Sequence, residues 1–354
     1  MSITEATPET HQAQERAEFV DEVHAFHASP VFITQPGFMP AEPSSAMEPY
    51  LWRWADIRPA MLKSAELLPV GADGADRRVL NLINPGMEPR IGTTHTLTAS
   101  MQMVLPGEVA DAHRHTINAL RLIVEGRGAS TTVDGEMCEL EPGDVVLTSG
   151  WRWHDHRNDG DEPVIWLDGL DLPLVRSLEG IFYEELPEGA QPVISSGDSI
   201  RRYGVGQLLP TWTKWEGMDS PLFNYKWADT RRALDALREA DGDPFDGVSL
   251  EFRNPTTGGS IGPTMSCGVN LLRPGLRAEE HRHTSSTVYH VIEGQGVTVI
   301  DGKEFAWSEG DTFVVPTWAW HRHANSSLTS DAVLFNFSDR PLMEKIGLYR
   351  EQPR

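Results

Sequence analysis

The chain repeats itself, and this internal duplication constrains its fold more than any other feature of the sequence. Four short segments recur 167 or 168 positions further on. The first copies are HRHT (113–116), VEGRG (124–128), VDGE (133–136) and WRWHDH (151–156). The second copies are HRHT (281–284), IEGQG (292–296), IDGK (300–303) and WAWHRH (318–323). With 354 residues the chain is long enough for two such units, each with its own core.

Each repeat unit begins with a predicted helix. LWRWADIRPAMLKSAELL from Leu51 resembles NYKWADTRRALDALREA from Asn224, and Asp56 and Asp229 are the expected N-caps. Between the units lies a segment rich in Pro, Gly and Ser, which is typical of a linker. We therefore expect an N-terminal helical arm (1–49), a first domain (50–185), a linker (186–222) and a second domain (223–354).

Within each unit the hydrophobic pattern is that of short strands. LRLIVEG, ASTTVDG, MCELEPGD and VVLTSGW are rich in apolar and β-branched residues and are separated by Gly, Asp and Pro at a spacing of about eight residues. This pattern favours an all-β barrel or sandwich over a parallel α/β sheet. The Gly126-x-Gly128 pair leads into another strand rather than a helix, so it is not a dinucleotide-binding motif.

Composition narrows the possible partners and the location. A net charge of −22 repels phosphate backbones, so we expect no nucleic-acid binding. No run of about 18 apolar residues is present, so we expect no membrane span. The polar, acidic N-terminus lacks the pattern of a signal peptide, and a cytoplasmic protein is expected. Cys138 and Cys267 are too few for a disulfide framework and are expected to be small buried residues.

Histidines are the candidate metal ligands. His113 and His115 are two positions apart, so a strand would point both imidazoles to one face, and His154 from a later strand could complete the set. The second copy repeats the arrangement with His281, His283 and His321. Imidazole suits zinc, copper, iron and nickel, and three ligands leave coordination positions open. Surface histidines in turns are the alternative, but the recurrence of the whole triplet disfavours it.

These residues resemble the two motifs of the cupin family. The first copy reads Gly107-x5-His113-x-His115 and then Gly143-x5-Ser149-x-Trp151-x2-His154-x3-Asn158, while the second copy keeps the usual proline at Pro316. The resemblance implies a bicupin: two tandem double-stranded β-helix (jelly-roll) barrels, each preceded by a helix. Many cupins add a glutamate ligand seven residues before the glycine that ends the first motif. Ala119 and Thr287 occupy those positions here, which disfavours the oxalate-cleaving cupins.

From about Tyr50 to the C-terminus the chain resembles gentisate 1,2-dioxygenase and its salicylate-cleaving relatives. The segments that carry this likeness include LINPGMEPRIGTTHTL, MQMVLPGEVADAHRHTINALRLIVEGRGASTTVDGE and SPLFNYKWADTRRAL. The resemblance implies an Fe(II) cofactor, an aromatic carboxylate substrate and O2. It implies that the ring opens between the carbons that bear the carboxylate and the hydroxyl. It also implies a homo-oligomer, a tetramer or a dimer.

Arginines are the expected carboxylate-binding residues, since a planar guanidinium clamps a carboxylate well. Arg121 interrupts an apolar strand, where a charge is costly unless it faces a polar cavity or a partner. The resemblance places a substrate-binding arginine there and a second one at Arg77 or Arg78. The alternative for each is a surface arginine.

Other side chains are expected near the metal. His156 shares a strand face with His154 and could bind or move a substrate proton, or could be only a neighbour of the metal site. Asp168 could orient His156 or Arg121, or form a plain salt bridge. Gln102 matches a pocket position of the family. Thr98 stands where relatives often carry Tyr or Trp, and His95 is expected to add a donor nearby.

The two copies differ at the arginine. Tyr289 occupies the position of Arg121 in the second copy, and Asn336 that of Asp168. We therefore predict that the first barrel is catalytic and that the second retains a metal site without the carboxylate clamp. Because Thr98 changes one wall, gentisate, a 5-substituted salicylate such as 5-nitrosalicylate, and 1-hydroxy-2-naphthoate all remain candidates. A non-redox metal-binding bicupin, either an isomerase or a ligand-binding module, is the alternative of another class.

Overall fold

The computed structural model describes residues 8–35, 37–68, 70, 77–205 and 208–354. The chain divides into two units, Met1–Ser44 and Ser45–Arg354. The first unit contains helix α1 (Pro8–His24) and the short helix α2 (Val31–Thr34). The sequence predicted a helical arm over residues 1–49.

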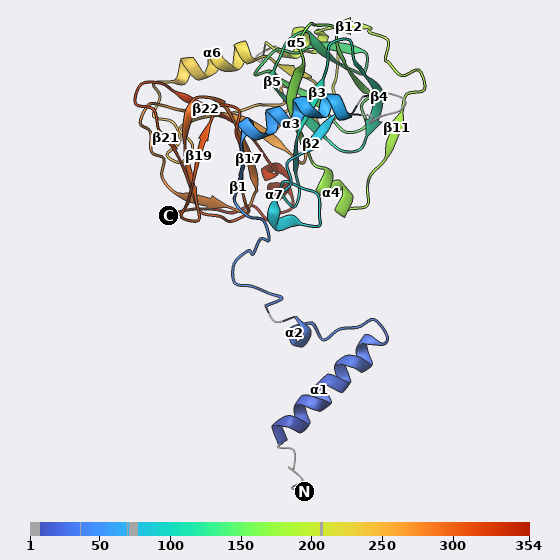
Figure 1. Ribbon diagram of the computed structural model, residues 1–354, viewed down its shortest axis with the longest axis vertical. Helices are drawn as coiled ribbons and strands as arrows, with labels where there is room; N and C mark the ends of the chain where they lie inside the picture. Colours follow the sequence, from blue (N-terminus) through green and yellow to red (C-terminus); the bar gives the residue numbers. More distant parts are fainter. Residues whose placement is uncertain (1–7, 36, 69, 71–76, 206–207) are drawn as a thin grey trace. The chain divides into compact units, whose positions relative to one another are not determined.

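The second unit contains the two barrels (Figure 1). The first barrel has the sheets β13-β8-β5-β10-β3-β2 and β11-β4-β9-β6-β7-β12, and the second has β1-β20-β17-β22-β15-β14 and β19-β18-β21-β16-β23. All strand pairs in these sheets are antiparallel except β12 with β7, as far as the described residues show. The expected bicupin fold class is therefore confirmed.

The bounds of the elements are as follows. The first barrel comprises β2 (Val79–Asn81), β3 (Thr98–Val104), β4 (Val109–His115), β5 (Ala119–Glu125), β6 (Ala129–Val133), β7 (Glu136–Glu139), β8 (Val145–Thr148), β9 (His154–Asn158), β10 (Val164–Leu170), β11 (Tyr183–Glu185), β12 (Ser195–Ser196) and β13 (Asn224–Tyr225). The second comprises β1 (Tyr50–Trp52), β14 (Val248–Glu251), β15 (Ser266–Leu272), β16 (His281–His283), β17 (Thr287–Glu293), β18 (Gln295–Ile300), β19 (Lys303–Ser308), β20 (Thr312–Val315), β21 (His321–Asn325), β22 (Ala332–Ser338) and β23 (Glu351–Pro353). The helices are α3 (Trp54–Leu67), the 3-10 helix η1 (Pro85–Met87), α4 (Leu172–Ser177), α5 (Asp198–Tyr203), α6 (Trp227–Leu237) and α7 (Arg340–Lys345).

The two barrels exchange their leading strands. β1, which precedes α3 in the first repeat, pairs with β20 of the second barrel, and β13 pairs with β8 of the first. The segment expected as a linker, 186–222, also contributes β12 and α5, and β12 extends a sheet of the first barrel. Sheet membership therefore crosses the boundaries expected between the domains.

The helices after these strands are capped from the opposite barrel. Asp311 accepts a hydrogen bond from the backbone N–H of Trp54 at 2.8 Å, and Asp144 accepts one from Trp227 at 2.8 Å. The prediction that Asp56 and Asp229 are N-caps was wrong, since both lie within the first turn of their helices. There they still favour the helix, because a carboxylate near a helix N-terminus interacts well with the dipole.

Strand alternation separates two kinds of core. On β5, Leu120 and Leu122 belong to a cluster that also contains residues of the second barrel such as Val269 and Phe337, so this cluster joins the barrels. Arg121 and Ile123 lie on the other face, toward the interior of the first barrel. The alternation thus places Arg121 inside a barrel whose outer wall is the inter-barrel core.

Both cysteines are buried, as expected. Among the described residues, no helix combines the length and the apolar character that crossing a membrane would require.

Candidate metal centre and active site

The first histidine cluster forms where β4 and β9 pair. His113 and His115 come from β4, and His154 lies directly opposite His113 on β9. One nitrogen from each of the three rings lies within 4.8 Å of the other two, and all three side chains are buried. The i, i+2 spacing therefore brings both imidazoles into the barrel, as expected from a strand.

Hydrogen bonds fix which ring nitrogen faces the centre. His115 Nδ1 donates to the Ile117 carbonyl at 2.8 Å, and His154 Nδ1 donates to the Arg152 carbonyl at 2.9 Å. His154 Nε2 is buried and has no hydrogen-bond partner among the residues described. A buried nitrogen without a partner is costly, and a metal ion would satisfy it. Burial lowers the pKa of His113 to about 3 and that of His115 to about 4, so both rings are neutral ligands at physiological pH. The donor set fits a divalent transition metal.

Arg77 lies against this cluster. Its Nη2 lies 2.5 Å from His113 Nδ1 and donates to the Asp111 carbonyl at 2.5 Å. Tyr183, from β11, stacks on His113 with ring centroids 5.3 Å apart. The guanidinium therefore adds a positive charge at the edge of the metal site.

Arg121 and Asp168 form a buried ion pair in the same barrel. They lie opposite each other on β5 and β10, and Arg121 Nε lies 3.1 Å from Asp168 Oδ1. Arg121 Nη1 donates to Thr148 Oγ1 at 2.6 Å, and Trp166 Nε1 donates to the same carboxylate at 3.1 Å. Burial raises the pKa of Asp168 to about 6, and Arg121 opposes that rise. One guanidinium nitrogen is therefore hydrogen-bonded, and Nε contacts Asp168 only as an ion pair.

His156 is fully enclosed beside the cluster. Its Nδ1 lies 2.8 Å from Thr131 Oγ1, its ring lies 6.0 Å from that of His154, and its Nε2 has no hydrogen-bond partner in the described part of the chain. Burial lowers its pKa well below the ordinary value, with Arg121 adding to the effect. The neutral ring therefore has one nitrogen held by the protein and one left for a ligand.

Thr98 and Gln102 share one face of β3. Gln102 lies opposite Trp166, a residue of the first barrel's interior, and both side chains are buried. Thr98 Oγ1 and Gln102 Nε2 have no hydrogen-bond partner within the described residues. The structure therefore brings both to the interior wall that also carries Arg121 and Asp168.

Two expected substrate residues have partners outside the histidine cluster. Arg78 is 1% exposed and forms two hydrogen bonds of 2.9 Å with the carboxylate of Glu108, so its guanidinium is committed to a structural ion pair. His95 lies 3.9 Å from Asp339, a residue of the second barrel. Of the two neighbouring arginines it is Arg77 that reaches the histidines, and we leave Arg78 and His95 out of the site.

The second barrel repeats the histidine cluster. His281, His283 and His321 each place a nitrogen within 4.8 Å of the other two. His283 Nδ1 donates to the Ser285 carbonyl at 2.8 Å and His321 Nδ1 to the Ala319 carbonyl at 3.0 Å, while Glu351 lies 3.2 Å from His281 Nδ1. The Nε2 atoms of His281 and His321 are buried and unpartnered in the described chain. This donor set fits a metal as well as the first does.

The cavity of the second barrel has different chemistry. It measures about 130 Å³ and its lining includes the carboxylates Asp246 and Glu351 and the guanidinium of Arg340. Tyr289 stands where the first barrel has Arg121, and Asn336 donates to Asn270 at 2.6 Å rather than pairing with a cation. The arginine–aspartate pair of the first barrel therefore has no equivalent at these two positions.

Two kinds of site residue were missed from the sequence. Tyr183 and Glu351 occupy equivalent places, because β11 pairs with β4 as β23 pairs with β16. Thr131 holds His156 as Thr298 holds His323, both at 2.8 Å. A signal for the threonines was present, since both lie in the repeated segment just before the Asp-Gly turn. The strands at 183 and 351 are three residues long and carry no such motif.

Two tandem barrels, each with a buried three-histidine cluster, define a bicupin metalloprotein. In agreement, a family model described as the cupin domain matches residues 100–170 and 269–337. The chain is 41% identical to gentisate 1,2 dioxygenase 1 of Aquipseudomonas alcaligenes over 99% of each chain. It is 39% identical to 5-aminosalicylate 1,2-dioxygenase of Comamonas sp, over 89% of this chain and 84% of that one.

A solved structure agrees with these relatives. Salicylate 1,2-dioxygenase from Pseudoaminobacter salicylatoxidans, crystallised as an adduct with gentisate, superposes with a TM-score of 0.89 at 34% identity, covering 100% of this chain and 96% of that one. The chain belongs to the gentisate and salicylate 1,2-dioxygenase family of bicupin enzymes. It is thus a ring-cleaving dioxygenase, an oxidoreductase with a metal cofactor.

Proposed function

We propose that the chain is an iron(II)-dependent dioxygenase that opens gentisate in its first barrel. The ring bond between the carbons bearing the carboxylate and the adjacent hydroxyl would break, and both atoms of O2 would enter the product, maleylpyruvate. The observation that carries the assignment to the first barrel is the buried Arg121 beside the histidine cluster, where the second barrel has Tyr289.

His113, His115 and His154 would hold the iron. When bound, iron(II) would supply open coordination positions for the substrate oxygens and dioxygen, and the redox chemistry that activates dioxygen. The protein contributes neutral imidazoles whose Nδ1 atoms are already engaged, as the hydrogen bonds of His115 and His154 to backbone carbonyls indicate. This fixes the direction of the ligand nitrogens before metal binds.

Arg121 and Arg77 would bind the substrate carboxylate. Arg121 Nη1 donates to Thr148, Nε faces Asp168 at 3.1 Å as an ion pair without a hydrogen bond, and Nη2 makes neither a hydrogen bond nor an ion pair with the described residues. Nη2 is therefore the atom we assign to the carboxylate. Asp168 is a positioning residue, since it acts through the guanidinium. Arg77 adds a second positive charge next to His113.

His156 would hold the proton of the substrate hydroxyl. When its Nδ1–H donates to Thr131, Nε2 is an unprotonated acceptor in a dry environment. The neutral Nε2 can accept a hydrogen bond from the substrate hydroxyl and so orient its proton, and the lowered pKa keeps the ring neutral in this role. Trp166, whose ring lies 5.0 Å from that of His156, closes this side against water.

A 5-substituted salicylate is the second candidate substrate. Thr98 leaves more room on one wall than an aromatic side chain would, and the relative from Comamonas sp is named for 5-aminosalicylate. The unpartnered Thr98 Oγ1 and Gln102 Nε2 could bind a polar ring substituent. Gentisate, whose 5-substituent is a hydroxyl, satisfies the same groups and remains the leading candidate. The non-redox bicupin is not favoured, because these relatives are named as dioxygenases.

For the second barrel we propose a bound metal without ring cleavage, because Tyr289 stands at the position of Arg121 and the arginine that does line the cavity, Arg340, donates to Glu344 at 2.8 Å. We also propose a homotetramer or dimer located in the cytoplasm. The exposed Phe19, Phe26 and Met39 of the N-terminal arm support subunit contacts, and the two buried thiols suit a reducing compartment.

Oxygen uptake tests the proposal. Protein loaded with iron(II) is incubated with gentisate, salicylate, 5-aminosalicylate, 5-nitrosalicylate and 1-hydroxy-2-naphthoate in an oxygen electrode. We expect one O2 consumed per gentisate, with both atoms of isotopically labelled dioxygen recovered in the ring-opened acid. Absence of uptake with all five compounds would reject the proposal, and faster turnover of 5-aminosalicylate would replace gentisate as the substrate.

A further inference from the structure

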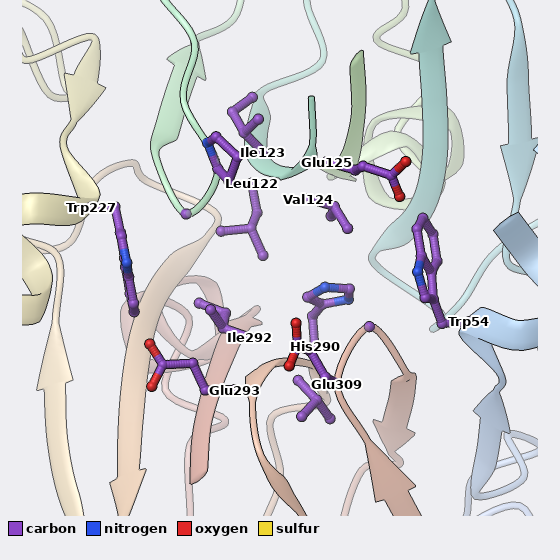
Figure 2. Close-up of a pocket in the computed structure, with 14 residues that line it drawn as sticks. Trp54, Leu122, Ile123, Val124, Glu125, Trp227, His290, Ile292, Glu293 and Glu309 are labelled. Carbon is purple, nitrogen blue, oxygen red and sulfur yellow. The ribbon is translucent and has the colours of Figure 1, made fainter. Parts of the chain in front are cut away.

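A pocket of about 460 Å³ lies between the two barrels, apart from both histidine clusters. Its walls are the ends of β5 (122–125) and β17 (290–293), together with the turns at 142–143 and 309–310 and the rings of Trp54 and Trp227. Figure 2 shows the two tryptophans on opposite sides with His290 between them. The volume lies within the range of about 300–1,000 Å³ that small-molecule sites occupy.

The pocket is built from equivalent residues of the two repeats. Trp227 packs over Gly143 just as Trp54 packs over Gly310, since a Cβ on either glycine would lie 2.5 Å from the tryptophan Cγ. Glu125 and Glu293 also occupy equivalent positions on β5 and β17. The two repeats therefore contribute tryptophan, glycine and glutamate residues from equivalent positions to the pocket walls.

The two walls differ at positions where the second repeat has polar residues and the first repeat has apolar ones. His290 stands in place of Leu122, Thr312 in place of Val145 behind it, and Glu309 in place of Pro142. A core position at the junction of two barrels has no structural need for a histidine, because the first half fills the same position with leucine. The substitutions make one wall of the pocket apolar and the other polar.

His290 is a buried polar group that faces the pocket. It is 2% exposed, its Nδ1 lies 2.9 Å from Thr312 Oγ1, and its imidazole projects into the pocket (Figure 2). Its Nε2 makes no hydrogen bond with the part of the chain that the structure describes. Burial lowers the pKa of His290 to about 3, so the ring is neutral and adds no positive charge.

The charged groups around the pocket leave a surplus of negative charge. Arg58 binds Glu125 through bonds of 2.7 and 2.6 Å, and Arg231 binds Glu293 at 2.8 Å. Glu309 is exposed at the rim and has no ion-pair partner among the described residues. The pKa of Glu293 is raised, first by burial and further by Glu309, although Arg231 opposes the rise.

We propose that this pocket binds a small organic cation: a primary ammonium group carried on an apolar body. The ammonium would lie between Glu309 and Nε2 of His290 and donate to both. The apolar body would pack on Leu122, Val124 and Ile292, with the indole faces at the two ends available for cation–π and ring contacts. An anion would be repelled by the carboxylates, and a neutral ligand would gain nothing from Glu309.

Benzylamine, protonated at neutral pH, is the probe. Isothermal titration of the metal-loaded protein with benzylamine is compared with titration with benzyl alcohol, which keeps the ring and removes the charge. We expect saturable binding of benzylamine at one site per chain, and weaker or absent binding of benzyl alcohol. Equal binding of benzyl alcohol, or no saturable binding of benzylamine, would overturn the proposal.

The first repeat supplies the matched variant. H290L/T312V replaces each polar residue by its counterpart in the first half, so the core stays filled. We expect benzylamine affinity to fall by about 10-fold from the lost hydrogen bond. E309Q, at an exposed position, should lower it about 3-fold. Gentisate-dependent oxygen uptake should be unchanged in both. If H290L/T312V folds poorly, E309Q alone decides, and unchanged affinity in E309Q would contradict the proposal.

Discussion

Replacing Arg121 by glutamine tests the substrate-binding role most sharply. In the folded chain Arg121 is 4% exposed, its Nη1 donates to Thr148 and its Nε faces Asp168 as an ion pair. Arg121→Gln keeps much of the side-chain volume and removes the charge. It therefore affects two interactions at once, the one with Asp168 and the one with the substrate carboxylate.

The magnitudes differ for the two interactions. Leaving a buried charge without its partner costs about 3–5 kcal/mol of folding free energy, reduced here because Asp168 can take up a proton. Loss of one charge-assisted hydrogen bond to the substrate costs about 1.5–3 kcal/mol, which lowers kcat/KM about 10- to 150-fold. We expect both effects in the single variant.

The double variant R121Q/D168N separates them. It removes both charges, so the melting temperature should recover toward that of the wild type while kcat/KM for gentisate, measured by oxygen uptake, stays low. Arg121→Lys is the control that keeps the charge and should lose less. If the double variant restored kcat/KM to within about 3-fold of the wild type, Arg121 would be only the structural partner of Asp168, and the reasoning would fail.

Three further results are expected. Burial raises the pKa of Asp168 from 3.8 to about 6, so the folded state binds this proton more tightly than the unfolded state. The free energy of unfolding that this proton contributes is present at low pH and is lost as the pH rises through 6. Below pH 6 protonation of Asp168 weakens its ion pair with Arg121, so KM for gentisate should rise on acidification. A rise of KM that persists in Asp168→Asn would refute this. Gly143→Ala places a Cβ 2.5 Å from Trp227 at a φ of +87° and should lower the free energy of unfolding by about 2–4 kcal/mol in thermal denaturation. Gly107→Ala, at φ +77° with open space, should lose only about 1 kcal/mol, and equal losses would contradict the contact argument. Removing the metal with a chelator should abolish oxygen uptake and lower the melting temperature. Adding zinc should restore only the melting temperature. Oxygen uptake by the zinc-loaded protein would argue against redox chemistry at the metal.

The histidine clusters could be predicted because they depend on local spacing. His113 and His115 are two apart on one strand, and the recurrence of the triplet removed the alternative of surface histidines. The same comparison of repeats identified Tyr289 at the place of Arg121. Such features need no knowledge of which strands pair.

Features that depend on distant pairing could not be predicted. The cap of α3 comes from Asp311, 257 residues away from Trp54, so the nearer Asp56 was the natural but wrong choice. Strand β1 is three residues long, and nothing in YLW indicates that it joins the opposite barrel. Short strands take their partners from the assembled sheet rather than from their own sequence.

Neighbouring arginines posed a related difficulty. Arg77 and Arg78 differ by one position, and a one-residue difference in an extended chain exchanges the two faces. The sequence could name the pair but not the member that reaches His113. Burial of Arg78 against Glu108 decides between them, and that contact appears only when β2 pairs with β3.

The central claim is that two equal histidine clusters have unequal functions. The most direct measurement is oxygen uptake with gentisate by His154→Ala and His321→Ala, each prepared with iron(II) and analysed for metal content and melting temperature. Each variant should lose about half of the bound metal. We expect His154→Ala to have no ring-cleaving activity and His321→Ala to retain it. Activity that survives in His154→Ala and disappears in His321→Ala would contradict it.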